Sequence, residues 1–143
     1  MQIKPFRLET KDISLILYLL SLPFPALYLD HDYIALRDNV YSSLYVLIWG
    51  IFSLPDGTVA WFANPFFIIA YLGRNIKSSV VFSILATISA LSSFFYSSIW
   101  NDGDGRIQIV GYGSGFYIWL ASIVLLTASN LNNYQRNTPN RQK

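Results

Sequence analysis

The stretch SLPDGTVAWFANPFF, Ser53–Phe67, places Pro-Asp-Gly and Asn-Pro inside a segment that is otherwise almost wholly apolar. The whole segment, Val40 to Gly73, would measure about 50 Å as one straight helix, at 1.5 Å per residue. The hydrocarbon core of a bilayer is only about 30 Å thick. The polar interruptions therefore predict that the segment is divided into two pieces.

We expect Val40–Leu54, which is too short to span, to form a re-entrant or interfacial helix. Pro55 ends that helix because it lacks an N–H, and Gly57 tolerates the dihedral angles of a turn. Asp56 is a good N-cap for the next helix, Thr58–Gly73, which then crosses the membrane. A long broken helix, or five crossings in all, are the alternatives.

The composition predicts an all-α integral membrane protein. Of its 143 residues, 53% are hydrophobic and 13% are charged, whereas soluble domains carry about 25% charged residues. Aromatic residues make up 17% of the chain, enough for belts at both membrane interfaces. The apolar residues form five runs: Ile13–Leu29, Val40–Leu54, Thr58–Gly73, Ser79–Ile99 and Gly115–Leu131.

The basic residues predict the orientation. Eight of the ten precede the first run, follow the third or lie in the tail: Lys4, Arg7, Lys11, Arg74, Lys77, Arg136, Arg141 and Lys143. Because basic loops stay in the cytoplasm, we expect both termini inside and loops 30–39 and 100–114 outside. This gives four transmembrane helices in a bacterial inner membrane, a single bundle over residues 1–132, and a polar basic cytoplasmic tail over residues 133–143.

Two polar residues at membrane depth are candidates for a site. Asp56 is interpreted as a helix cap, with binding of a cation, a proton or a basic partner group as the alternative. Pro65 removes the bond to the carbonyl of Trp61, so we expect a kink there, with the Asn64 amide bonding freed backbone or a neighbouring helix. A ligand-facing Asn64 is the alternative.

Small residues at alternating spacings of four and three predict a helix-packing stripe in the fourth run. They are Ser79, Ser83, Ala86, Ala90, Ser93 and Ser97, and a sparser set follows at Gly115, Ser122 and Ser129. Catalysis by these serines is not expected, because the sole histidine, His31, lies in an outer loop.

The outer loop WNDGDGRIQIVGYGSG predicts a tight turn at Asn101–Gly105, which contains Asp102 and Asp104, followed by RIQIV as a short strand or cover over the bundle mouth. Gly111 and Gly113, on either side of Tyr112, together with Gly115 would allow the loop to approach a helix closely. A calcium loop of the EF-hand type is excluded, because its first and last ligand positions would be Trp100 and Gly111.

The charge and the cysteine count exclude several classes of protein. A net charge of +2 without an interleaved basic patch gives no case for nucleic-acid binding. The chain has no cysteine, which removes disulfides and thiolate metal sites. We expect neither a metal nor a cofactor.

Two motifs resemble segments of a set of small, uncharacterised bacterial inner-membrane proteins. The first is Trp-x-Ala-Asn-Pro, with Trp61, Ala63, Asn64 and Pro65; the second is Gly-Tyr-Gly-x-Gly-x-x-x-Trp-Leu, with Gly111, Tyr112, Gly113, Gly115, Trp119 and Leu120. The likeness covers roughly residues 40–131. It implies a four-helix membrane protein and names no activity.

We expect a non-enzymatic bundle that binds the lipid bilayer and a partner, as an accessory subunit of a membrane complex or by self-association. Small-residue stripes and few charges at membrane depth favour this interpretation. One alternative is an immunity protein against a membrane-targeting toxin. The other is a small transporter or membrane enzyme that uses Asp56 and Asn64.

Overall fold

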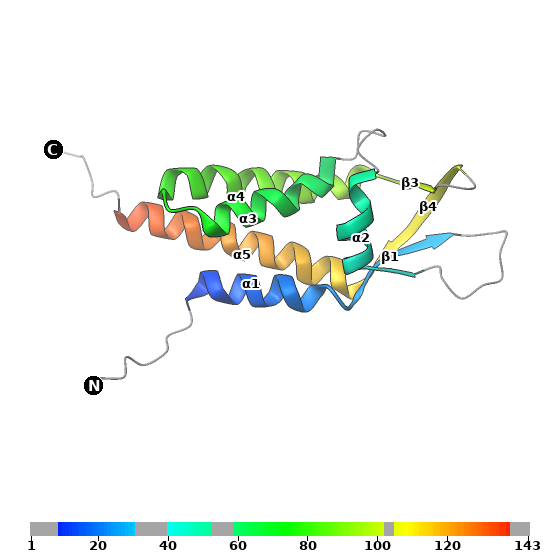
Figure 1. The fold of residues 1–143 in the computed structure, drawn as a ribbon, viewed down its shortest axis with the longest axis horizontal. Helices are drawn as coiled ribbons and strands as arrows, with labels where there is room; N and C mark the ends of the chain where they lie inside the picture. Colours follow the sequence, from blue (N-terminus) through cyan, green and yellow to red (C-terminus); the bar gives the residue numbers. More distant parts are fainter. Residues whose placement is uncertain (1–8, 31–39, 53–58, 102–104, 138–143) are drawn as a thin grey trace.

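Four helices run alternately up and down to form a bundle, and a small sheet covers one of its ends (Figure 1). The structure is a computed structural model that describes residues 9–30, 40–52, 59–101 and 105–137. A short helix, α2, lies across the bundle axis next to the sheet. The helices are α1 (Thr10–Ser21), α2 (Ser43–Trp49), α3 (Ala63–Leu72), α4 (Ile76–Leu91) and α5 (Ser114–Asn137), with 3₁₀ helices η2 (Val59–Phe62) and η3 (Ser92–Phe95).

The sheet corrects the expectation of an all-α protein. Its four antiparallel strands stand in the order β2-β1-β4-β3. They are β1 (Pro25–Asp30), β2 (Val40–Ser42), β3 (Ser98–Asn101) and β4 (Gly105–Tyr112). The strand expected at RIQIV is confirmed as part of β4, where Leu29 pairs with Ile109 and Ile99 with Ile107.

The first apolar run, Ile13–Leu29, is not one helix. Helix α1 ends at Ser21, and β1 begins at Pro25. Pro23 and Pro25 explain the change, because each lacks an N–H and disfavours helical dihedrals at the residue before it. The chain therefore continues in an extended form that pairs with β4.

Four transmembrane helices are not supported by the lengths observed. Among the described residues, two helical stretches are long and apolar enough to cross a membrane, Ile76–Phe95 and Ser114–Asn137. Helix α1 has 12 residues, about 18 Å at 1.5 Å per residue, and Val59–Leu72 is also shorter than a span. The helical bundle is observed, and two of its members have the length of a membrane span.

The segment Val40–Gly73 is divided, as expected, but its first part differs from the expectation. Residues 40–42 join the sheet, and α2 begins only at Ser43, where the Ser42 side chain accepts a bond from the Tyr45 N–H at 3.3 Å. The expected turn at Pro55-Asp56-Gly57 lies outside the described residues.

The kink expected at Pro65 is replaced by a change of helix type. The 3₁₀ helix η2 ends at Phe62 and α3 begins at Ala63, so Pro65 lies in the first turn of α3. A first-turn residue has no intrahelical acceptor for its N–H, and proline is tolerated there. Proline therefore helps to start α3 instead of bending it.

Small residues mediate the packing of α4 in the bundle. Ser79, Ser83, Ala86 and Ala90 are buried, whereas Ser93 is half-buried in η3 and Ser97 is exposed. The stripe ends because α4 ends at Leu91, and a 3₁₀ helix has three residues per turn instead of 3.6. On α5, the residues of the sparser set are all buried: Gly115, Ser122 and Ser129.

Both described ends of the chain and the α3–α4 turn lie at one end of the bundle, opposite the sheet (Figure 1). Four basic residues lie at that end: Lys11 in the first turn of α1, Arg74 in the α3–α4 turn, Lys77 in the first turn of α4 and Arg136 in the last turn of α5. Helix α5 continues to Asn137, so the polar tail expected from residue 133 begins as helix.

Candidate functional site

Asn64 joins three parts of the bundle through its side-chain amide. Its Oδ1 accepts hydrogen bonds from the Tyr18 hydroxyl of α1 and from the Trp119 Nε1 of α5, each at 2.9 Å. Its Nδ2 donates at 3.1 Å to the Trp61 carbonyl of η2, which lies four residues before Pro65 and receives no N–H bond from that proline. Asn64 is buried, with 7% of its surface exposed.

The chemistry of these partners fixes the orientation of the amide. An indole N–H is a donor only, so the atom that faces Trp119 must be the Asn64 oxygen. An amide offers two acceptor and two donor positions, and three of the four are filled by the bonds described. The sequence predicts that the Asn64 amide bonds either backbone or a neighbouring helix, and in the structure it bonds both.

Trp61 ties η2 to α2. Its Nε1 donates to the Leu47 carbonyl at 2.8 Å, and its ring lies against Gly50, where an added Cβ would come within 2.9 Å of the ring. A glycine at this point therefore lets the indole reach across to α2.

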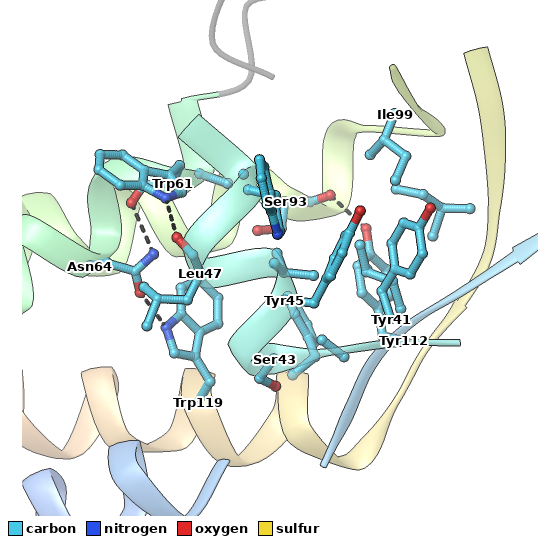
Figure 2. Close-up of a pocket in the computed structure, with 18 of the residues that line it drawn as sticks. Tyr41, Ser43, Tyr45, Leu47, Trp61, Asn64, Ser93, Ile99, Tyr112 and Trp119 are labelled. Carbon is cyan, nitrogen blue, oxygen red and sulfur yellow. Dashed lines mark hydrogen bonds between the residues drawn. The ribbon is translucent and has the colours of Figure 1, made fainter. Parts of the chain in front are cut away.

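A cavity of about 300 Å³ lies between α2, the bundle and the sheet. We call it the aromatic cavity, because ten of the 22 described residues that line it are aromatic. They include three of the four tryptophans, Trp49, Trp61 and Trp119. Figure 2 shows the network of Asn64, Trp61 and Trp119 on one side of α2 and the side chains of Tyr41, Tyr112 and Ile99 on the other.

The Tyr112 hydroxyl is anchored at the sheet side of the aromatic cavity. It donates to the Ser93 carbonyl at 2.6 Å, which connects β4 to η3 (Figure 2). Burial, with a smaller contribution from Tyr117, raises the pKa of the Tyr112 phenol. The group is thus a neutral donor at physiological pH, and no charge is introduced here.

Two glycines permit the close contact between the start of α5 and the start of β1. A Cβ on Gly113 would collide with the Pro25 carbonyl, and one on Gly115 would come within 2.6 Å of the Phe24 carbonyl oxygen and would also collide with Ser43 Oγ. Gly113 thus lies close to a strand, and Gly115 lies close both to the chain just before β1 and to the first residue of the helix α2. Gly111 has space, its nearest neighbour atom lying 4.0 Å from an added Cβ.

Ser43, the first residue of α2, is buried and lines the aromatic cavity. Its Oγ has no hydrogen-bond partner within the described part of the chain. Four other buried serines, by contrast, bond to backbone carbonyls within their own helices: Ser14, Ser21, Ser83 and Ser122.

The structure brings together only part of the predicted site. Asn64, Ser93 and Tyr112 all line the aromatic cavity. Asp56, Asp102, Asp104 and His31 lie outside the described residues, so the predictions for them stay predictions.

Sequence reasoning missed the partners that complete the site: Tyr18, Trp119 and Ser43. The aromatic content was assigned to interfacial belts, although many of these rings turn inward around one cavity. Tyr18 lies 46 residues from Asn64 and Trp119 lies 55 residues away, so only the tertiary fold shows that they meet. The signal that could have indicated them is the position of Tyr18 among aliphatic residues in a run otherwise suited to lipid.

Comparisons with models of protein families, with curated proteins and with solved structures found no match to this chain. The resemblance to small inner-membrane proteins therefore stays a prediction.

Proposed function

We propose that this protein is an integral protein of a bacterial inner membrane that works by binding a membrane partner, as an accessory subunit, and catalyses no reaction itself. The observation that carries the proposal is the apolar outside of the bundle. Large apolar side chains cover that outside, although the bundle already has an apolar core that contains several buried serines. Water would penalise such an outside, and lipid would not.

The outward faces of the helices are apolar along the bundle. On α4, Val81 is 55% exposed and Ile88 is 60% exposed, and on α3 Leu72 is 69% exposed. The same holds on α1 for Ile13, Ile16, Leu19 and Leu20. In the most apolar part of each span-length stretch, the buried share is 22% for Ile76–Phe95 and 33% for Ser114–Asn137. The core helix of a soluble protein would instead be mostly buried.

The buried hydroxyls suit a dry environment because most already have partners. Thr127 Oγ1 bonds to the Ser83 carbonyl and to Thr87 Oγ1, both at 2.9 Å, and so links α5 to α4. Asn130 Nδ2 adds a bond to the Ser79 carbonyl at 3.3 Å. Bonds of this kind hold transmembrane helices together.

In the proposed arrangement α4 and α5 span the hydrocarbon core, and the shorter α1 and α3 pack beside them within it. The end with Lys11, Arg74, Lys77 and Arg136 faces the cytoplasm, following the positive-inside rule. The sheet end then faces the outside. Partner binding is favoured over catalysis because the polar side chains of Asn64, Trp61 and Trp119 are committed to holding the fold.

Cysteine labelling tests the orientation, since the chain has no cysteine of its own. Val110→Cys and Arg136→Cys place one exposed thiol at each end. We expect an impermeant maleimide to label Val110→Cys in intact cells and Arg136→Cys only after permeabilisation. The reverse pattern, or labelling of both in intact cells, would contradict the proposal.

Photo-crosslinking tests the partner. A benzophenone amino acid at the outward position Ile88, and in separate variants at Val81 and Ile69, samples the apolar surface in native membranes. We expect one discrete protein adduct from at least one position. Lipid adducts alone from every position would contradict a partner-binding role without affecting the assignment to the membrane.

A further inference from the structure

The aromatic cavity has the size and lining of a small-molecule site, which goes beyond the role of a partner-binding subunit. Its volume of about 300 Å³ falls at the lower end of the range for ligand pockets, roughly 300–1,000 Å³. It is built by residues from α1, α2, η2, α5 and the sheet together, so it is a feature of the whole fold. Such mostly apolar, preformed concave sites are where proteins bind small ligands.

The lining determines the charge of any ligand. The described residues around the aromatic cavity include no Asp, Glu, Lys, Arg or His. A charged group would lose its hydration there without gaining a counter-ion, at a large free-energy cost. The described part of the lining therefore favours an uncharged occupant.

The walls favour a flat ring over a flexible chain. Trp61 and Trp119 are held by hydrogen bonds at their indole N–H groups, and Tyr112 is held at its hydroxyl. Their polar tips are thus occupied, while the ring faces and edges stay in fixed positions. Fixed aromatic walls give offset-stacked or edge-to-face contacts to another ring, beyond the benefit of apolar burial.

Ser43 provides the polar feature of the site. Its hydroxyl is buried and without a partner in the described part of the chain, a state that costs free energy and calls for an explanation. The Oγ lies against Gly115 of α5 in this structure. Rotation of the side chain toward the aromatic cavity would bring it to a carbonyl or hydroxyl oxygen on a ligand. The serine would then select a ligand that carries an oxygen.

We propose that the aromatic cavity binds an uncharged, flat ring compound with a hydrogen-bonding oxygen, of the chemical class of membrane-soluble quinones and phenols. The ring lies among Trp61, Trp119 and Tyr112, and its oxygen bonds to Ser43. The proposal requires only the cavity, so it stands or falls separately from the partner.

Tryptophan fluorescence tests this site directly, because three of the four tryptophans line it. The probe is menadione, a naphthoquinone without a tail, titrated into the full-length protein in lipid nanodiscs. Quinones quench tryptophan emission, and the absence of cysteine in the chain prevents thiol adducts. We expect saturable quenching, with no competition from decanol, which has a hydroxyl on a flexible chain.

Three variants make the test specific. Ser43→Ala removes a hydroxyl that has no bond to lose, so we expect unchanged thermal stability and an affinity about five- to tenfold lower. Ala60→Phe fills the cavity and should abolish saturable quenching, while Ala121→Phe, on an exposed position of α5, should not change it. The proposal would be overturned if the quenching did not saturate, or if wild type and Ser43→Ala bound menadione equally well. It would also be overturned if decanol reversed the quenching by competing with menadione.

Discussion

Between α4 and α5, small residues bring two helices close together, and Thr127 and Asn130 of α5 each bond to a backbone carbonyl of α4. Around the aromatic cavity, the side chains of Tyr18 from α1 and Trp119 from α5 instead meet at the single side chain of Asn64, and Trp61 bonds to α2. The first region needs little beyond regular helices at close range. The second needs several elements to be in place at once.

This difference determines how each region should respond to substitution. The contact of α4 with α5 is sensitive to added volume, because buried Ala and Ser leave no space. The region around the cavity is sensitive to lost hydrogen bonds, because a buried donor that loses its acceptor costs free energy. The following predictions separate the two sensitivities.

The largest effect is expected at the point where α5 meets β1. Gly115→Val would drive its side chain into the backbone carbonyls of Phe24 and Pro25, which cannot rotate away as a side chain does. We expect a loss of more than about 3 kcal/mol in the free energy of unfolding, measured in mixed micelles. The matched control is Gly111→Ala, which has space; equal losses in both variants would refute the close contact.

Asn64→Leu comes next, because it leaves the donors of Tyr18 and Trp119 and the carbonyl of Trp61 without the partner seen here. We expect a loss of about 2–3 kcal/mol in the free energy of unfolding. Asn130→Leu makes the same replacement between α4 and α5, where one bond of 3.3 Å is lost, and should cost about 0.6 kcal/mol. If Asn130→Leu costs as much as Asn64→Leu, the two regions do not differ in the way described.

Ala90→Leu probes added volume in the helix contact. Ala90 is fully buried and its neighbour Leu91 is 44% exposed, so we expect overpacking to cost about 1–3 kcal/mol and Leu91→Ile to be mild. Thermal stability of the two purified variants decides the matter. Equal stability would mean that position 90 tolerates a large side chain and is not a close helix contact.

The smallest effect is expected for Thr127→Val, which keeps the shape of the side chain and removes the bonds to Thr87 and to the Ser83 carbonyl. Polar bonds between membrane helices average about 0.6 kcal/mol, and we expect a loss of that size in the free energy of unfolding. A loss above about 2 kcal/mol would show that hydrogen bonds, and not close packing, dominate the α4–α5 contact.

The sequence allowed the helix contact to be predicted better than the cavity. A stripe such as Ser79, Ser83, Ala86 and Ala90 is a local pattern with helical spacing, and the structure buries all four. Asn64 and Pro65 could likewise be linked to the freed Trp61 carbonyl by local chemistry alone.

The sheet end could not be predicted in the same way. An apolar run such as residues 25–30 has the same composition in a strand as in a helix, and only Pro23 and Pro25 indicate the difference. The pairing of Leu29 with Ile109, and the meeting of Tyr18 with Asn64, depend on contacts across the whole chain. The aromatic cavity is a product of those contacts.

The central claim is that the apolar outside of the bundle faces lipid, and spin labels test it most directly. A nitroxide attached to Ile88→Cys, 60% exposed on α4, should collide often with oxygen and rarely with a water-soluble nickel complex in reconstituted membranes. A label at Arg136→Cys, at the end of α5, should show the opposite preference. Ready access of the nickel complex to the label at position 88 would contradict the account, because that surface would then face water.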